Sequence, residues 1–321
     1  MAGKFGMVKC YFEHGLWSSN QVKDAVSKGM ITSGEYKAIT GEVFEEAILK
    51  KADKIKKTKA LRQYIVNTFT EEVFTGNPAA VCVTQEYISD ELMNKIAVEN
   101  KLSNTCFAFK DGSSYNLRLF TPGGEIDLCG HATLAAAYVI LNFFEKNKDI
   151  LEFDTISGKI KVTKNYDVYE IDLPESELIS VPVTDQMAEA LGIRPKEAFL
   201  GRDLLCVFDK EEDIISMRPK KKRLVGLDGL VTHVTAPSES EKYDCVLRSF
   251  APKCKITEDP VSGAAYCLTA PYWFRRLNKN VMVSRQASRR GGTVYCKTIK
   301  KGRIILCGKA VLYSEAEIFV D

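Results

Sequence analysis

Two polar turns that contain glycine, each followed at once by an apolar helical stretch, constrain the fold of this 321-residue chain more than any other feature. The first turn, Leu128-Cys-Gly-His-Ala-Thr133, opens an apolar stretch that runs from Gly130 through Phe144. The second turn, Thr257-Glu-Asp-Pro-Val-Ser-Gly-Ala-Ala265, opens another that ends at Phe274. A helix that is hydrophobic nearly all round is buried in its domain. We therefore expect two similar halves, each with strands around one buried helix.

The segments around these two stretches have the composition and the turn signals of β-strands. The expected strands comprise residues 63–69, 79–83, 105–109, 115–120, 151–155, 159–163, 169–172, 206–208, 231–235, 293–298, 303–307 and 310–313. Helices are expected from Ser89 through Ala97 and near residues 184–191. This pattern predicts a duplicated α+β fold. We place the first half at residues 61–178 and the second at 179–321, with the option that the last strand returns to the first half.

The first 60 residues have a different, helical character. Ser18-Ser-Asn-Gln21 and Thr32-Ser-Gly-Glu35 both have the form of a capping box, and Gly29 and Gly41 are placed to end the two helices. A third helical stretch is expected from Glu42 into a run of lysines between residues 50 and 59. That run is interpreted as a solvated helix face or linker, with an anionic partner site as the alternative. Residues 1–60 are therefore predicted to be a separate helical module with a basic linker.

Charge and cysteine usage exclude several classes of protein. The net charge of +3 gives no support to nucleic-acid binding. The 10 cysteines are scattered singly and the chain has 3 histidines, which excludes the common zinc spacings. Most of the cysteines are therefore expected to be free, buried thiols in a reducing compartment. No signal peptide or membrane-spanning stretch is evident, so we expect a soluble, cytoplasmic protein that does not enter a membrane.

The two polar turns are also where chemistry is expected. Each would place unpaired backbone N–H groups at the positive end of a helix, where a carboxylate or a developing oxyanion is stabilised. Two such helix starts across a cleft could grip a small acid and stabilise the enolate formed when its α-proton is removed. Taken singly, a Gly-His helix start is more often structural, and Asp259-Pro260 could equally be an N-cap followed by proline. Their matched positions in the two halves favour a shared site.

Six motifs follow one another along the chain: Phe74-Thr-Gly-Asn-Pro78, Lys101-Leu-Ser-Asn-Thr-Cys-Phe107, Phe120-Thr-Pro122, Leu128-Cys-Gly-His-Ala-Thr-Leu134, Glu258-Asp-Pro-Val-Ser-Gly263 and Gln286-Ala-Ser-Arg-Arg-Gly-Gly292. In this order they resemble the PhzF-like family of phenazine biosynthesis, from about Tyr64 to the C-terminus. The resemblance implies the diaminopimelate-epimerase-like fold, with two pseudo-symmetric halves and a cleft between them. It also implies a homodimer that needs no cofactor or metal, and isomerisation of a small carboxylate-bearing metabolite by moving a proton between carbon positions.

The resemblance assigns roles to individual residues. It implies Asp259, His131 and Asn104 as the catalytic positions. The substrate-binding positions that it implies are Asn77, Ser103, Cys129, Gly130, Ser262, Gly263 and Ala264. Two of these depart from the family pattern, because Asn104 stands where the family has an acid/base glutamate and Ala264 where it has a serine. An amide has no usable pKa near neutral pH, so Asn104 cannot replace that glutamate as a proton carrier.

Two side chains could substitute for the missing glutamate. Glu99 lies on the preceding predicted helix and is interpreted as a surface charge. Cys129 directly precedes a helix start, where a thiolate is favoured, and related diaminopimelate epimerases use cysteine thiols. A buried, inert cysteine is the alternative for Cys129. Cys106, inside an expected strand, is interpreted as a core residue.

Two further segments carry weaker signals. Leu16-Trp-Ser-Ser-Asn-Gln-Val22 and Glu35-Tyr-Lys-Ala-Ile-Thr-Gly41 resemble small phage proteins of the XkdX type, which implies a fused module and a phage-related partner through residues 1–60. Arg218-Pro-Lys-Lys-Lys-Arg223 could be a nuclear-import signal or an anion patch, although a solvated loop is the simpler interpretation. Three functions remain open at this point: an isomerase, a degenerate relative that binds a small acid or a partner, and a scaffold protein.

Overall fold

The computed structural model describes residues 4–42, 44, 60–300 and 302–320. The chain divides into two compact units, one of residues 1–59 with 319–321 and one of residues 60–318, and each is described by itself. The expected lysine-rich helix between residues 45 and 59 lies outside the described residues. Among the described residues, no helix has both the length and the apolar character that a bilayer crossing requires.

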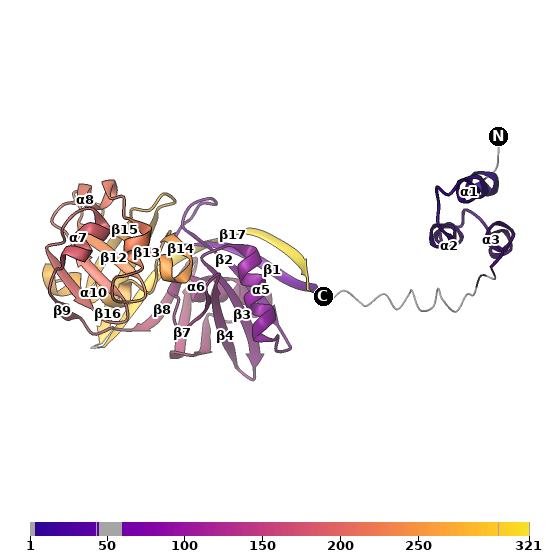
Figure 1. Ribbon diagram of the computed structural model, residues 1–321. Helices are drawn as coiled ribbons and strands as arrows, with labels where there is room; N and C mark the ends of the chain where they lie inside the picture. Colours follow the sequence, from indigo (N-terminus) through magenta and orange to yellow (C-terminus); the bar gives the residue numbers. More distant parts are fainter. Residues whose placement is uncertain (1–3, 43, 45–59, 301, 321) are drawn as a thin grey trace. The chain divides into compact units, whose positions relative to one another are not determined.

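The N-terminal unit contains three short helices, α1 (Lys4–Glu13), α2 (Ser19–Ser27) and α3 (Ser33–Thr40) (Figure 1). Both predicted capping boxes are present, since the Ser18 N–H donates to Gln21 Oε1 at 2.8 Å and the Thr32 N–H donates to Glu35 Oε2 at 2.6 Å. The helices enclose a small apolar core of Val8, Val22, Ala25, Ile31, Tyr36 and Ile39. Helix α1 was not predicted, because its sequence carries no capping signal.

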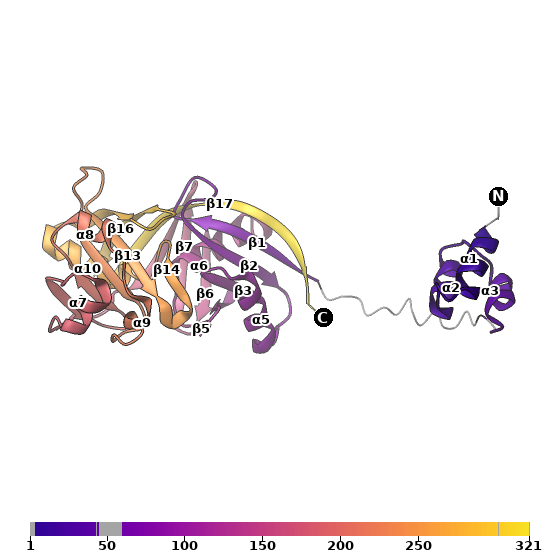
Figure 2. The same cartoon turned by 45° about the horizontal axis from the view of Figure 1, so that its top comes forward.

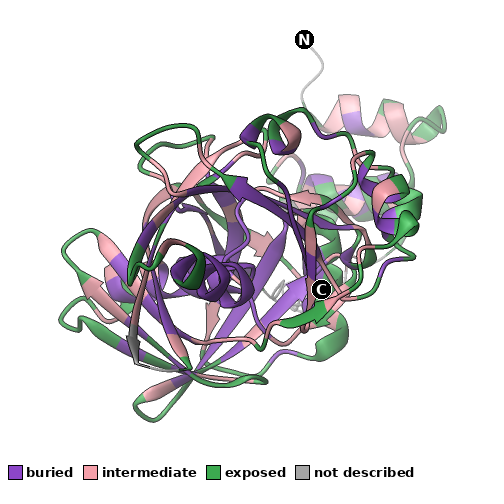
Figure 3. Cartoon of the chain, turned by 90° about the vertical axis from the view of Figure 1, so that its left-hand side faces the viewer, coloured by how far each residue is buried: buried purple, intermediate pink, exposed green. Residues whose placement is uncertain are grey.

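In the first half of the larger unit, a ring of strands encloses one helix. The elements are β1 (Ala60–Thr68), β2 (Asn77–Thr84), α5 (Asp90–Asn100), β3 (Asn104–Asp111), β4 (Ser114–Thr121), β5 (Gly124–Ile126), α6 (Gly130–Val139), β6 (Ile150–Thr155), β7 (Gly158–Asn165) and β8 (Val168–Pro174). Strands β1, β2, β3, β4, β6, β7 and β8 pair in that order, and β17 (Arg303–Phe319) closes the ring by pairing with both β8 and β1. Figure 3 views the larger unit from the side of the second half and shows a buried helix surrounded by strands.

The predicted helix from Gly130 to Phe144 is confirmed, but it changes character on the way. Helix α6 is buried at nearly every position, and its last turn, Ile140–Phe144, is π-helical. A helix that is enclosed on all sides cannot direct polar residues to solvent, which explains its apolar sequence. Because the strands surround the helix, they also set the position of its polar first residues.

The second half has a sheet covered by helices on both faces. Its elements are β9 (Ile179–Val181), α7 (Asp185–Leu191), β10 (Glu197–Leu200), β11 (Leu204–Val207), α8 (Glu211–Ser216), α9 (Lys221–Leu224), β12 (Thr232–Pro237), β13 (Cys245–Ala251), β14 (Ile256–Asp259), α10 (Tyr266–Leu277), β15 (Val281–Gln286) and β16 (Gly292–Lys300). Alternate residues of β11 face opposite cores, with Leu205 toward α10 and Leu204 toward α7. This double burial hides the alternation that identifies a half-exposed strand.

Several details of the second half differ from the sequence predictions. The strands β9, β10, β13, β14 and β15 were missed, and the two strands expected at 303–307 and 310–313 form the single strand β17. Figure 2 shows β17 extending beside β1. The basic segment expected to be a loop includes the short helix α9. Of the 10 cysteines, all are free and most are buried, as predicted.

Element ends position the polar residues of the two turns. Asn77 begins β2, Asn104 begins β3 and Asp259 ends β14. Strands β2 and β3 are parallel, with Ala79 opposite Asn104, so these two strand starts share one edge of the ring. That edge is where the candidate site lies.

Candidate active site

The starts of the two buried helical segments touch through glycine. A Cβ atom added to Gly263 would lie 2.7 Å from Gly130 Cα and 2.8 Å from the His131 backbone nitrogen. Real Cβ atoms do not approach backbone atoms this closely, so only glycine fits at this contact. The close approach brings Asp259, four residues before Gly263, to the wall that faces the start of α6. The two predicted turns therefore converge.

Asp259 carries a carboxyl group that is poised to exchange a proton. Although the residue keeps some exposed surface, its carboxyl group is enclosed by protein, and this desolvation raises its pKa from 3.8 to about 6. Hydrogen bonds from Asn77, Ser262 and Ser103 and the nearby His233 oppose the rise. The carboxyl group therefore changes charge close to physiological pH.

Asn77 connects Asp259 to the first half. Its amide nitrogen lies 2.6 Å from Asp259 Oδ1, 2.8 Å from the Val261 carbonyl oxygen and 3.1 Å from His131 Nδ1. An amide nitrogen has two hydrogens, so it cannot donate to all three acceptors at once. The two shorter contacts hold Asp259 and the turn that follows it. Asn77 Oδ1, by contrast, is buried without a partner among the described residues.

His131 and Cys129 form the opposite side of the site. Cys129 Sγ lies 3.2 Å from His131 Nδ1, and the Cys129 thiol donates to Asn104 Oδ1 at 3.1 Å. Complete burial lowers the pKa of His131 to about 3, so the imidazole is neutral at physiological pH. Burial, together with the charge of Asp259, raises the pKa of Cys129 above its usual range. Cys129 is therefore a protonated thiol.

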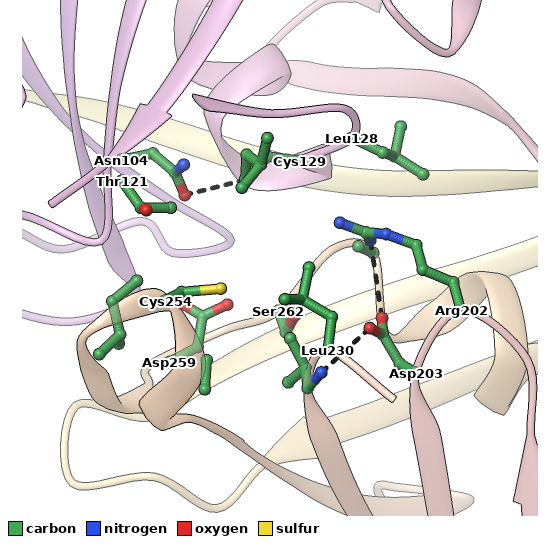
Figure 4. A pocket seen from close by; sticks show the side chains of 15 residues that line it. Asn104, Thr121, Leu128, Cys129, Arg202, Asp203, Leu230, Cys254, Asp259 and Ser262 are labelled. Carbon is green, nitrogen blue, oxygen red and sulfur yellow. Dashed lines mark hydrogen bonds and ion pairs between the residues drawn. The ribbon is translucent and has the colours of Figure 1, made fainter. Parts of the chain in front are cut away.

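The cleft between these groups is narrow. Its volume is about 40 Å³, which holds a few water molecules. The side chains in Figure 4 come from both halves. The residues that line the cleft are Asn104, Thr121, Ile126, Leu128, Cys129, Arg202, Asp203, Leu230, Val231, Ala251, Cys254, Ile256, Asp259, Ser262 and Ala264. A metabolite-sized ligand therefore requires the two walls to separate.

The sequence-predicted site residues fall into two groups. Asn104, Cys129, Asp259, Ser262 and Ala264 line the cleft. The others, which lie behind this lining and support it, are Asn77, Ser103, Gly130, His131 and Gly263. His131 and Asn77 are completely buried and lie directly behind the residues that line the cleft.

Comparisons with known proteins identify relatives of this chain. Residues 66–316 match the sequence profile of the phenazine biosynthesis-like proteins, PhzC and PhzF. An uncharacterised isomerase of Pseudomonas aeruginosa is 39% identical over 248 residues, which cover 77% of this chain and 95% of that protein. A crystal structure of a PhzF-family protein from Enterococcus faecalis superposes with a TM-score of 0.76 at 43% identity, covering 81% of this chain and 100% of that one. The chain belongs to the PhzC/PhzF family.

Family membership also accounts for the architecture. A hydroxyproline epimerase of Agrobacterium vitis shares the fold at 10% identity, with a TM-score of 0.60 over 83% of this chain and 94% of that one. The predicted diaminopimelate-epimerase-like class, with two halves around buried helices, is confirmed. At the other end of the chain, residues 5–44 match the profile of an uncharacterised phage protein, XkdX, as the N-terminal motifs predicted.

The PhzC/PhzF motifs did not point to a second polar group in the cleft. Asp203 is 1% exposed and accepts from the Val231 N–H at 3.1 Å. His233 Nε2 lies 3.3 Å from Asp203 Oδ2, and His233 Nδ1 lies 2.9 Å from Ser249 Oγ. Despite its burial, the hydrogen bond and charge of His233 hold the pKa of Asp203 below its ordinary value.

Arg202, which precedes Asp203, is the cation of this group. No sequence motif identified Arg202, Asp203 or His233, since they lie on strands and turns outside the six motifs. The signal available in the sequence was two adjacent charged residues, Arg202 and Asp203, after Gly201 and between apolar segments.

Proposed function

We propose that this protein is an isomerase that moves a carbon-bound proton on a small carboxylate-bearing metabolite, without a cofactor, in the cleft between its halves. Asp259 is the proton carrier in this proposal. The relatives named as isomerases support the reaction class. The observation that carries the proposal is the Asp259 carboxyl group, which is enclosed at the cleft wall and has a pKa of about 6.

The proposed step needs no group outside the cleft. The ionised Asp259 carboxylate takes a proton from a carbon next to an electron-withdrawing group, and the C–H electron pair moves into the adjacent π-system. The protonated Asp259, whose proton exchanges with water in the cleft, then donates a proton to a different carbon, so that atoms and charge balance. A general base with a pKa near the working pH is best suited to both half-steps. A pKa of about 6 meets this requirement better than the ordinary value of 3.8.

The neighbouring groups have supporting roles in this proposal. Asn77 holds the Asp259 carboxylate, and neutral His131 orients the Cys129 thiol from behind the cleft wall. Asn104 presents its amide to the substrate as a hydrogen-bonding group. The helix starts at Gly130 and Gly263, with Ser103, Ser262 and Ala264, shape the remaining wall. His131, which the resemblance implies as a catalytic position, is a weak base here, because burial lowers its pKa to about 3.

A second candidate function is favoured by one observation. Asn104 lies in the cleft where the family resemblance implies an acid/base glutamate, and its Oδ1 accepts a hydrogen bond from Cys129. A cleft that has lost one of two acid/base groups could bind a small acid without turnover. This alternative predicts binding without proton exchange.

Solvent deuterium incorporation tests the two candidates. The protein is incubated in deuterium oxide with a panel of cyclic and acyclic amino and hydroxy acids, and label at carbon is followed by NMR and mass spectrometry. Under the proposal the wild type incorporates deuterium and Asp259→Asn does not. The control is Asp185→Asn, which removes a carboxylate that is 88% exposed and is not part of the cleft lining, and it should retain the wild-type rate.

The variant Asn104→Glu distinguishes an active enzyme from a degenerate one. General acid–base catalysis contributes about 10²–10⁴-fold, so restoring a carboxylate should be measurable. Exchange by Asn104→Glu alone would identify a degenerate enzyme that binds a small acid. Exchange by neither protein, across the whole panel, would contradict the isomerase proposal and leave binding or scaffolding as the function.

A further inference from the structure

One cationic side chain lies in the cleft. Among the described residues that line it, Arg202 alone carries a positive charge, and Figure 4 shows its side chain projecting from the wall of Asp203 toward the wall of Leu128. The side chain is 25% exposed, so the charge is partly desolvated but reachable from the opening. The proposed proton transfer gives this arginine no task.

Arg202 joins the two halves through an ion pair. Its Nη2 atom lies 2.8 Å from Asp127 Oδ1, and Asp127 follows β5 in the first half. Its Nη1 atom lies 3.6 Å from Asp203 Oδ2 in its own half. An ion pair from a cleft-lining residue therefore joins the two halves.

The two carboxylates that contact Arg202 are held very differently. Asp203 has a side chain that is 2% exposed and is also fixed by His233 and the Val231 N–H. The Asp127 side chain is 44% exposed, and Arg202 is its ion-pair partner. An ion pair with such an exposed carboxylate contributes little free energy. An entering carboxylate can therefore displace Asp127 without displacing Asp203.

The other hydrogen-bond donors in and behind the cleft wall already have partners. Backbone N–H groups of His131 and Ala132, at the start of α6, face the Cys129 sulfur and oppose the rise in its pKa. The Ser103 and Ser262 hydroxyls are directed to Asp259. A guanidinium binds a carboxylate through two parallel hydrogen bonds, which an ammonium or a hydroxyl cannot do. Arg202 is thus the best-placed receptor for an anionic group.

We infer that Arg202 binds a carboxylate of the substrate in exchange for Asp127 and so determines the specificity of the cleft for anionic acids. The inference rests on the proposed function in taking this cleft as the substrate site. It makes Asp127 a competitor of the substrate rather than part of the binding site. Removing Arg202 and removing Asp127 should therefore have opposite effects on the binding of acids.

Calorimetry with a matched pair of probes tests the inference. The probes are 2-aminobenzoate and 2-aminobenzamide, which have the same ring and differ in the charge of one substituent. The wild type should prefer the acid. Arg202→Gln should weaken binding of the acid by about 10–100-fold, because a hydrogen-bonded charge pair is lost, and should leave binding of the amide unchanged. Asp127→Asn should strengthen acid binding by up to about fivefold, because an exposed competing pair is removed.

Two controls separate charge recognition from structural damage. Arg202→Lys keeps the charge but cannot make two parallel hydrogen bonds to a carboxylate. Its affinity for the acid should therefore lie between those of the wild type and Arg202→Gln. Arg194→Gln breaks an exposed ion pair with Asp185 in the same half, outside the cleft lining, and should leave the affinity for both probes unchanged. With any acid that shows exchange, Arg202→Gln should raise KM by the same factor and leave kcat within about threefold.

Several results would overturn the inference. If Arg202→Gln and Asp127→Asn weakened binding of the acid equally, the ion pair would have a structural role only. The absence of any preference for the acid in the wild type would also refute it. An acid preference that depends on Arg202, without deuterium exchange on any acid, would refute the proposed function alone. If the exchange reaction had the same KM in Arg202→Gln as in the wild type, this inference alone would be refuted.

Discussion

Replacing Asp259 by asparagine removes a carboxyl group whose pKa the fold raises from 3.8 to about 6 through desolvation. A group that binds its proton more tightly in the folded state stabilises the fold fully below its unfolded pKa. That contribution is lost as the pH rises through the folded pKa. The difference between 3.8 and about 6 corresponds to about 3 kcal/mol in the free energy of unfolding. Asparagine has nearly the same shape and does not titrate.

The measurable quantity is the pH dependence of the difference between the two proteins. Between about pH 4.5 and about pH 8, the wild type should lose about 2 kcal/mol of unfolding free energy relative to Asp259→Asn. Changes in hydrogen bonding to Ser103 and Ser262 add an offset that does not depend on pH. His131, whose pKa burial lowers from 6.5 to about 3, changes the stability of both proteins alike between these two values and so cancels in the difference. Urea unfolding of both proteins, followed by circular dichroism at several pH values, gives the difference.

Asp203→Asn is the matched control on the other carboxyl group of the cleft. Burial opposes ionisation there, but His233 holds the pKa of Asp203 below 3.8, so its stabilising contribution is lost only as the pH falls below that value. The difference from the wild type should stay nearly constant across the same window. The same difference in unfolding free energy could also stay constant for Asp259→Asn, or the wild type could gain stability over Asp259→Asn as the pH rises. Either result would show that Asp259 is not desolvated as described.

Three further predictions concern the glycine contact, the Asn77 hydrogen bond and the N-terminal helices. Gly263→Ala should destabilise the protein by about 1–3 kcal/mol in urea unfolding and abolish exchange, whereas Gly226→Ala, whose added Cβ meets ordinary contact at 3.5 Å, should not. Asn77→Ala removes a hydrogen bond that lowers the pKa of Asp259, so the acidic limb of the kcat/KM profile should move above its wild-type midpoint of about 6. Deleting residues 1–58 should leave a soluble, cooperatively unfolding protein, because the helices α1–α3 have their own core; loss of folding on calorimetry would contradict this.

Local signals in the sequence determined a large part of this structure. Capping boxes at Ser18 and Thr32 placed the two helices that follow them, because a cap depends on residues three positions apart. The apolar run after Gly130 identified a buried helix before any neighbour was known. Some residues of the family motifs, among them Asn104, Cys129 and Asp259, line the cleft. Five strands of the second half were missed. Burial at every position removes the alternation of β13, and β9, β10 and β14 have only three or four residues each.

Only the tertiary structure decided how the site works. Asn77 and Asp259 are 182 positions apart, and their contact of 2.6 Å arises from the approach of Gly130 to Gly263. The pKa of Asp259 depends on the protein that encloses it, which no spacing in the sequence expresses. The pairing of Arg202 with Asp127 likewise joins two halves that carry no shared motif at these positions. Desolvation and charge pairing are set by neighbours across the chain, and those neighbours exist only once the two halves have packed together.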